Sequence, residues 1–291
     1  MADEISGRPR DLLVSGHVNV DRFLTVDEFP AADRTVPVVL QRVELGGTGA
    51  NLARVAARYG VATGLVARIG REFPADFLRR LRTAGIDLRG LEQVAIEATP
   101  TCFILEDRRG VQRTLIDQGP MGGGRGARVP GAWLDEYSWL HVTTGDPTFQ
   151  LRLARAARAH GLRVAADPAQ EIHYRWKRRQ FAELLAASEL FFGNRGEVAR
   201  AVEYSGCSDP SGLLERVPLV VRTEGPRGAT AFSRTETVHV PAERPRSKRS
   251  TVGAGDAFRG GFYAAWFEGE PLRKCLTAGV RASRRWIEDA T

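Results

Sequence analysis

The sequence predicts an α/β fold in which helices cover both faces of a mostly parallel sheet. Two observations carry this prediction: short aliphatic runs alternate with amphipathic helical segments, and Gly, Pro or Asn closes each run. The composition agrees with it, since 43% hydrophobic and 26% charged residues in a chain of 291 suffice for a sizeable core. No internal repeat or linker divides the chain, so we expect a single domain spanning residues 1–291.

The strand candidates are continuous apolar runs, which are typical of strands buried on both faces of a parallel sheet. They are DLLVSG, ATGLVARIG, WLHVTTG, LRVAADP, LFFGN and PLVVRTEG.

Amphipathic helices are predicted between these strands. In GANLARVAARYG, the residues Leu52, Val55, Ala56 and Tyr59 are spaced i, i+3, i+4 and i+7, which places them on one helix face. Similar stripes occur in EIHYRWKRRQFAELLAAS, RGEVARAVEYSG and PLRKCLTAGVRAS.

Two segments, residues 21–45 and 99–117, interrupt this alternation. Both are rich in β-forming residues and lack a helical pattern, and DRRG within the second fits a hairpin turn. We expect them to form a small second sheet. Parallel sheets bind ligands at the carboxyl ends of their strands, so a sheet inserted there would act as a lid.

Several classes of function are disfavoured by composition. No apolar run is long enough to span a membrane and the N-terminal residues lack a secretory signal pattern, so we expect a cytoplasmic location without membrane contact. Cys102, Cys207 and Cys275 are scattered, which favours core-filling thiols over disulfides or zinc. The net charge of +7 comes from arginines dispersed along helical segments without interleaved aromatics, which predicts no nucleic-acid partner.

The stretch TVGAGDAFRGG, residues 251–261, is the first candidate for chemistry. Backbone N–H groups of Gly253, Ala254 and Gly255 at a helix N-terminus would form an anion site suited to phosphate. A carboxylate there would repel phosphate, and its natural role is to accept a proton from an attacking hydroxyl. Taken alone, the pattern fits equally well a structural turn with Asp256 as the helix cap.

A second glycine turn stands near the N-terminus, in ELGGTGANLARVAARYG. Gly46, Gly47 and Gly49 would allow a ligand to approach the backbone, and the Asn51 amide can donate to and accept from hydroxyl groups. The spacing is not GxGxxG, so a polyol site fits better than a dinucleotide site.

Together these residues resemble the ribokinase-like (PfkB) family of carbohydrate and nucleoside kinases over nearly the whole chain. Its two glycine signatures are matched by GGTGAN, residues 46–51, and STVGAGD, residues 250–256. GHVNVD (16–21) is similar to the family's first-strand motif, NRGE (194–197) to its NxxE motif and TEGPRG (223–228) to its TxGxxG motif. Each match alone could be a turn or a helix cap, but five in the family's order make that improbable.

The resemblance implies a three-layer α/β/α fold with a lid, and transfer of the γ-phosphoryl group of ATP to a hydroxyl, assisted by Mg²⁺. Asp256 would be the general base beside the anion site of Gly253, Ala254 and Gly255. The other implied roles are acceptor binding for Asn19, Asp21, Gly46, Gly47 and Asn51, nucleotide binding for Asn194, Thr223, Gly225 and Gly228, and water-mediated magnesium binding for Glu197.

The acceptor is suggested by departures from the ribokinase pattern. Thr48 stands where ribokinases usually carry Lys, and the segment from Thr101 to Met121 is more similar to the lid of bacterial and archaeal adenosine or nucleoside kinases, although Val111 replaces that pattern's Asn. A nucleoside is therefore the first expectation, and a sugar or sugar phosphate the second. A catalytically silent ligand sensor on the same fold is the alternative of another class, and the retained Asp256 argues against it.

The remaining expectations concern single residues and assembly. Asp167 ends a strand and could reach phosphate or magnesium through water, whereas His17, His141 and Trp176 are expected to be packing residues. Ser250 replaces the Asp with which many family members bind a monovalent cation, so we expect little dependence on potassium. Either Arg246, Lys248 and Arg249 supply the positive potential instead, or these side chains point to solvent on an exposed loop. Exposed lid strands tend to be covered, so we expect their edges to pair in a homodimer.

Overall fold

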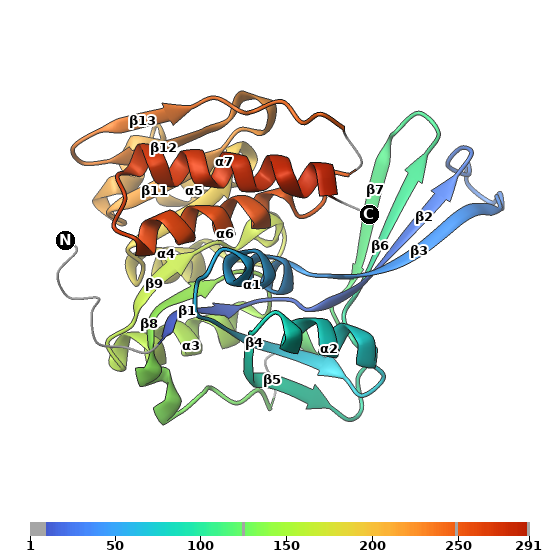
Figure 1. The fold of residues 1–291 in the computed structure, drawn as a ribbon, viewed down its shortest axis with the longest axis horizontal. Helices are drawn as coiled ribbons and strands as arrows, with labels where there is room; N and C mark the ends of the chain where they lie inside the picture. The colour runs from blue at the N-terminus through green and yellow to red at the C-terminus, as the bar shows by residue number, and fades with distance from the viewer. Residues whose placement is uncertain (1–9, 124–125, 248–249, 290–291) are drawn as a thin grey trace.

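The large sheet of the protein is mostly parallel, as expected. The computed structural model describes residues 10–123, 126–247 and 250–289 (Figure 1). The strand order is β13-β12-β11-β10-β9-β8-β1-β4-β5, parallel from β11 to β5, with β12 and β13 added antiparallel at one edge. The strands are β1 (Arg10–Ser15), β4 (Thr63–Gly70), β5 (Asp87–Val94), β8 (Tyr137–Val142), β9 (Arg163–Ala166), β10 (Leu190–Asn194), β11 (Leu219–Thr223), β12 (Ala229–Ser233) and β13 (Thr237–Val240).

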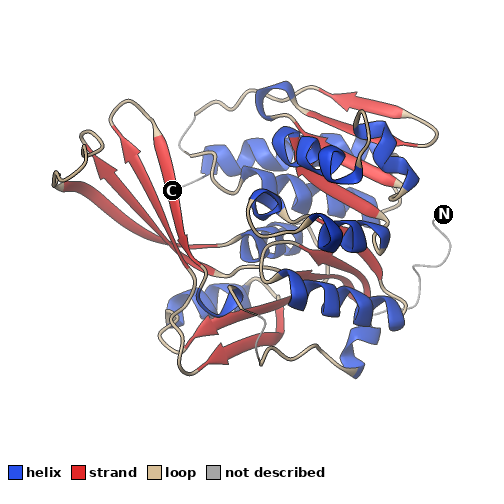
Figure 2. Ribbon diagram, turned by 180° about the vertical axis from the view of Figure 1, so that it is seen from behind, coloured by secondary structure: helices blue, strands red, loops and turns tan. Residues whose placement is uncertain are grey.

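Helices cover both faces of this sheet, which gives the three expected layers (Figures 1 and 2). One layer contains α1 (Thr48–Arg58), α2 (Ala75–Thr83), α6 (Ala254–Phe267) and α7 (Leu272–Asp289), and the other α3 (Pro147–Ala159), α4 (Arg178–Ala186) and α5 (Arg195–Ser205). Alternation along β1 separates two cores, since Leu12 and Val14 pack toward the first layer and Leu13 toward the second.

One predicted helix begins later than its apolar pattern suggested. Residues Ala169–His173 form a short 3-10 turn, and α4 starts only at Arg178. The Glu171 carboxylate turns inward and accepts the Gly145 backbone N–H at 2.7 Å, while Trp176 is buried as expected, with 2% exposure. Tertiary contacts therefore override the local helical pattern.

The smaller sheet projects from the body beside the carboxyl ends of the large sheet (Figure 1). It contains β2 (Asn19–Val26), β3 (Val38–Gly46), β6 (Thr101–Asp107) and β7 (Gln112–Asp117) in the order β3-β2-β6-β7. β2 and β6 are parallel, whereas β2–β3 and β6–β7 are antiparallel. The predicted DRRG turn joins β6 to β7, and the Asp107 carboxylate closes it by accepting the backbone N–H groups of Arg109 and Val111.

The cysteines match their expectation only in part. All three are free thiols, but only Cys275 is buried, while Cys102 and Cys207 are half-buried. Cys102 belongs to the lid face that lines a cavity rather than to a core. Among the described residues, every helix is too short or too polar to cross a bilayer.

Candidate active site

A cavity of about 510 Å³ lies where the carboxyl ends of the large sheet meet the lid, and we call it the polar cavity for the many polar side chains among its lining residues. Segments distant in sequence line it: the β1–β2 connection, the start of α1, the lid strands β6 and β7, and the starts of α5 and α6. The position agrees with the rule that parallel α/β sheets bind ligands at strand carboxyl ends.

The glycine turn that begins α6 forms part of the cavity wall. Gly253 adopts φ +79°, a left-handed conformation in which L side chains are strained, and Gly255 lines the cavity. The backbone N–H of Ala254 donates to the Thr251 carbonyl at 3.2 Å. This member of the predicted anion site is therefore engaged within the turn itself.

Asp256 lies in the first turn of α6 with its carboxylate toward the cavity. The Asn51 side-chain amide donates to Asp256 Oδ2 at 3.2 Å, so the two glycine signatures come together as expected. Burial raises the pKa of Asp256 to about 7, against the opposing effect of the Arg259 charge. Burial, reinforced by Asp256, likewise raises the pKa of Asp21 to about 7.

Arg259 was not anticipated from the sequence, although it lines the cavity and is only 5% exposed. Its Nη2 donates to Asp167 Oδ1 at 2.7 Å. His141 Nε2 lies 3.1 Å from the other Asp167 oxygen, and Asp167 is 2% exposed. Internal partners occupy both oxygens of Asp167, which disfavours the predicted water-mediated contact with phosphate or magnesium, and that contact remains a prediction. The i, i+3 spacing of Asp256 and Arg259 on α6 was the available signal.

Two glycines of the N-terminal signature pack closely against neighbouring groups. A Cβ on Gly46 would lie 1.9 Å from Asp21 Oδ2, so the Asp21 carboxylate packs directly on this backbone. Gly47 adopts φ +94°, and a Cβ there would meet the His17 carbonyl at 2.4 Å. Gly47 lines the cavity itself, whereas Gly46 acts through Asp21.

Buried polar atoms without a hydrogen-bond partner gather in two groups around the cavity. Near Asp256 they are Asn19 Oδ1, Asp21 Oδ1 and Asn51 Oδ1. Around Glu171 they are His17 Nε2, Gln118 Oε1, Glu171 Oε1 and Arg175 Nε, of which the last two form an ion pair at 3.9 Å. Leaving such an atom unsatisfied costs about 1–3 kcal/mol, which predicts a polar ligand that supplies the missing bonds.

His17 is only partly the packing residue expected. It is 2% exposed, and its Nδ1 lies 2.7 Å from Thr144 Oγ1. Burial lowers its pKa to about 4, so the ring is neutral at physiological pH. Because it also lines the cavity, its unpaired Nε2 is available to a ligand.

The NRGE motif forms the start of α5. Asn194 Oδ1 accepts the Glu197 backbone N–H at 3.0 Å, and the Glu197 carboxylate accepts both the Asn194 backbone N–H and its side-chain amide at 2.7 Å. Both residues line the cavity, and burial raises the pKa of Glu197. The described residues include no cluster of three His, Cys, Asp or Glu side chains suited to a metal.

A second cavity of about 500 Å³ adjoins the first. It is mostly apolar, with Pro226, Phe258, Val280 and Ile287 among its walls. The two cavities share Thr223, Gly225, Thr251 and Gly255. Of the residues expected to bind nucleotide, Thr223, Gly225 and Gly228 line the second cavity, and Asn194 lines only the first.

Comparison with known proteins accounts for this arrangement. The family model described as pfkB family carbohydrate kinase matches residues 9–289. The chain belongs to this family. The predicted resemblance, fold and enzyme class are thereby confirmed, and the protein is a kinase that transfers phosphate to an alcohol group.

Individual relatives are similar over nearly the whole chain. A nucleoside kinase of Methanothermobacter thermautotrophicus is 32% identical over 282 residues, which cover 96% of this chain and 90% of the relative. An ATP-dependent ribose-1-phosphate kinase of Halopiger xanaduensis is 30% identical, with 91% and 88% covered. The crystal structure of Methanocaldococcus jannaschii nucleoside kinase superposes with a TM-score of 0.90 at 25% identity, with 97% and 93% covered.

Low dependence on potassium remains a prediction, and protein contacts at the turn support it. Trp286 Nε1 donates to the Val252 carbonyl at 2.7 Å, and the Val252 N–H donates to Ser250 Oγ at 3.2 Å. Since protein groups already hold this turn, replacing sodium by potassium in the assay should change turnover by less than about twofold. Strong activation by potassium would contradict this.

The basic residues expected to replace the cation are only partly described. Lys248 and Arg249 lie outside the described residues, and the Arg246 backbone N–H donates to Glu288 Oε1 at 2.8 Å.

Proposed function

We propose that the protein transfers the γ-phosphoryl group of ATP to a hydroxyl of a nucleoside. The observation that carries this proposal is the meeting of a polar and an apolar cavity at the start of α6, with Asp256 on the polar side. ATP would place its base in the apolar cavity and its phosphates at the turn, where the helix N-terminus favours negative charge. Because the reaction uses ATP, we also propose that the protein acts in the cytoplasm.

Asp256 is the general base in this mechanism. The acceptor hydroxyl gives its proton to the Asp256 carboxylate as its oxygen bonds to the γ-phosphorus, and the bond between that phosphorus and the β–γ bridging oxygen breaks to release ADP. A base must be ionised to act, and a pKa of about 7 matches this task near neutral pH. Asn51 holds the carboxylate through its amide.

Positive charge for the transferring phosphoryl group comes from Arg259 and the α6 N-terminus, which both border the polar cavity. Mg²⁺ usually keeps several waters and binds through one or two carboxylates and the substrate phosphates, a requirement that the Glu197 carboxylate facing the cavity fits. Glu197 and Asn194 would hold the ion through water, and the ion would shield the triphosphate charge.

A nucleoside accounts for both groups of unpaired polar atoms. Asn19, Asp21 and Asn51 would bind ribose hydroxyls beside Asp256, and His17 and Glu171 would bind the base. A free sugar is too small to reach both groups, and the Glu171 group would keep only its protein partners, among them the Arg175 guanidinium 3.9 Å from Glu171. The names of the archaeal relatives support the same acceptor. The lid segments, residues 21–45 and 99–117, would close over it as part of a single domain.

A sugar phosphate is the second candidate acceptor. Arg175 pairs with Glu171 and Asp146 only at 3.9 Å, beyond hydrogen-bond distance, and its Nη2 donates to the Gly122 carbonyl at 2.7 Å. Such a guanidinium could bind a phosphate at the position proposed for the base, in keeping with the Halopiger relative.

Asp256→Asn should lower kcat by at least about 10²-fold with little change in ATP affinity, because it removes the base and retains the shape of the side chain.

The wild-type enzyme should lose kcat/KM for the acceptor as the pH drops below about 7. The carboxyl groups of Asp21 and Asp256 both have a pKa raised to about 7, and their protonated forms cannot accept the proton. Coupled-enzyme rates from pH 5 to 9 (roughly the range in which both forms exist) test this. Full activity in Asp256→Asn would remove the proposed mechanism.

Glu171→Gln should change the choice of acceptor. The carboxylate can only accept hydrogen bonds when ionised, so replacing one oxygen by an NH₂ group should lower kcat/KM about tenfold for nucleosides whose base donates to it. Rates with nucleosides, ribose and ribose 1-phosphate test this, and ribose should be little affected.

Glu183→Gln is the matched control, because Glu183 pairs with Arg155 on the surface, away from the cavity. If Glu171→Gln slowed ribose and nucleosides equally, base recognition by Glu171 would be excluded.

We also propose that the lid joins two copies of the chain. Val43 and Leu115 are 43% and 62% exposed, and their strand partners Arg22 and Phe103 place them on the lid face opposite Asp21. A Val43→Lys/Leu115→Lys variant should therefore shift a dimer toward monomer in light scattering, whereas Ile96→Lys, at an exposed site outside the lid strands, should not. A wild type that stays monomeric at all concentrations would refute this.

A further inference from the structure

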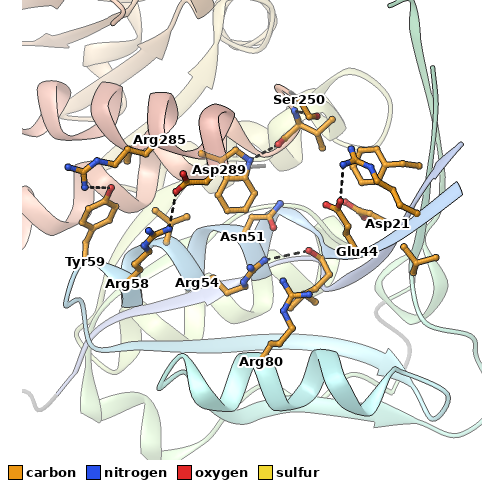
Figure 3. A pocket seen from close by; sticks show the side chains of 18 residues that line it. Asp21, Glu44, Asn51, Arg54, Arg58, Tyr59, Arg80, Ser250, Arg285 and Asp289 are labelled. Atoms are coloured by element: carbon orange, nitrogen blue, oxygen red, sulfur yellow. Dashed lines mark hydrogen bonds and ion pairs between the residues drawn. The ribbon is translucent and has the colours of Figure 1, made fainter. Parts of the chain in front are cut away.

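An arginine-rich pocket of about 380 Å³ lies beside the polar cavity (Figure 3). Its walls come from the lid strands β2 and β3 and from the helices α1, α2 and α7. Its cationic lining consists of Arg42, Arg54, Arg58, Arg80 and Arg285. We call it the arginine pocket.

Acidic groups balance only part of this charge. Arg42 pairs with Glu44 at 3.1 Å and Arg58 with Asp289 at 3.5 Å. Within the described parts of the chain, Arg54 and Arg80 have no ion pair, and Figure 3 shows their side chains next to each other. Two adjacent guanidinium groups without an ion-pair partner attract an anion, although Glu44, which also lines the pocket, offsets part of the charge on Arg54.

Arg54 is fixed in place and half-buried. Its Nη1 donates to the Leu45 carbonyl at 3.5 Å, and its guanidinium lies 5.9 Å from the centroid of the Trp286 ring. Burial, and next the charge of Arg80, lower its pKa. Both effects disfavour the positive charge on the Arg54 guanidinium. An anion bound between Arg54 and Arg80 would stabilise that charge.

We propose that the arginine pocket binds the phosphate group of a small molecule, with Arg54 and Arg80 as its ligands. The planar guanidinium forms paired hydrogen bonds with phosphate oxygens. The pocket is large enough for an organic group beyond the phosphate, and Tyr59 and Trp286 provide aromatic surface for it. This inference does not depend on the identity of the acceptor.

The position of the pocket links its occupant to catalysis. It shares Asp21, Asn51 and Val252 with the polar cavity. A molecule in the arginine pocket would contact the lid and the helices together. Trp286, whose Nε1 donates to the Val252 carbonyl, forms part of the wall of this pocket. Binding should therefore change the KM of the acceptor. The phosphate has two sources: a separate effector, or the acceptor itself.

The test is calorimetric titration of the full chain with inorganic phosphate and with ribose 5-phosphate. A saturating non-hydrolysable ATP analogue blocks the phosphate site at α6 throughout. Arg80→Gln changes an exposed residue and should leave the fold intact, and Arg54→Lys keeps the charge but loses the paired geometry. Arg79→Gln is the matched control, since Arg79 is the neighbouring residue on α2, pairs with Asp76 and does not line the pocket.

We expect each pocket variant to weaken binding of at least one probe by about tenfold or more and the control to leave it unchanged. In a separate activity assay with ATP in place of the analogue, consumption of ribose 5-phosphate with a KM raised by Arg80→Gln identifies the acceptor's own phosphate. Phosphate that binds unconverted and alters the KM of a nucleoside identifies an effector. No binding of either probe to the wild type below about 10 mM, or equal binding by all variants, overturns the proposal.

Discussion

The site is organised around one buried cation, the Arg259 guanidinium. Asp167, Glu197 and Asp256 all stabilise its charge, and its own presence keeps the pKa of Asp256 from rising further. A buried arginine without such partners would cost several kcal/mol, so the three carboxylates and the arginine must be positioned together. This requirement ties the start of α6 to the ends of β9 and β10, and thereby places the turn where the sheet strands end.

Close backbone approach is the second constraint on the site. Gly46 leaves space for the Asp21 carboxylate, and a side chain on Gly253 would meet the Trp286 ring at 2.9 Å. These contacts bring α1, α6, α7 and the lid root within reach of one ligand. The buried polar atoms around the polar cavity that lack a hydrogen-bond partner have a related cause. A site that recognises hydroxyl and N–H groups must leave its own polar atoms free to bond them when the ligand binds.

The lid gives the molecule two pockets under one sheet face. Asp21 lines both, so the arginine pocket and the polar cavity share this side chain as well as the lid. Movement of the lid would alter both pockets together.

The sequence by itself determined the strand and helix alternation, the two β-rich lid segments and the pairing of GGTGAN with GAGD, because periodicity and glycine turns depend on neighbouring residues. Only the tertiary structure decided which polar residues face each other. Asp167 follows a strand, as a ligand-binding residue would, yet Arg259 and His141 hold it inside. Glu171 belongs to a segment with a helical pattern, yet its bond to Gly145 turns it into the cavity. Arg54 and Arg80 lie on two different helices, α1 and α2, and line one pocket only because the fold places these helices side by side. Such contacts join residues far apart in the chain, so patterns among neighbouring residues cannot predict them.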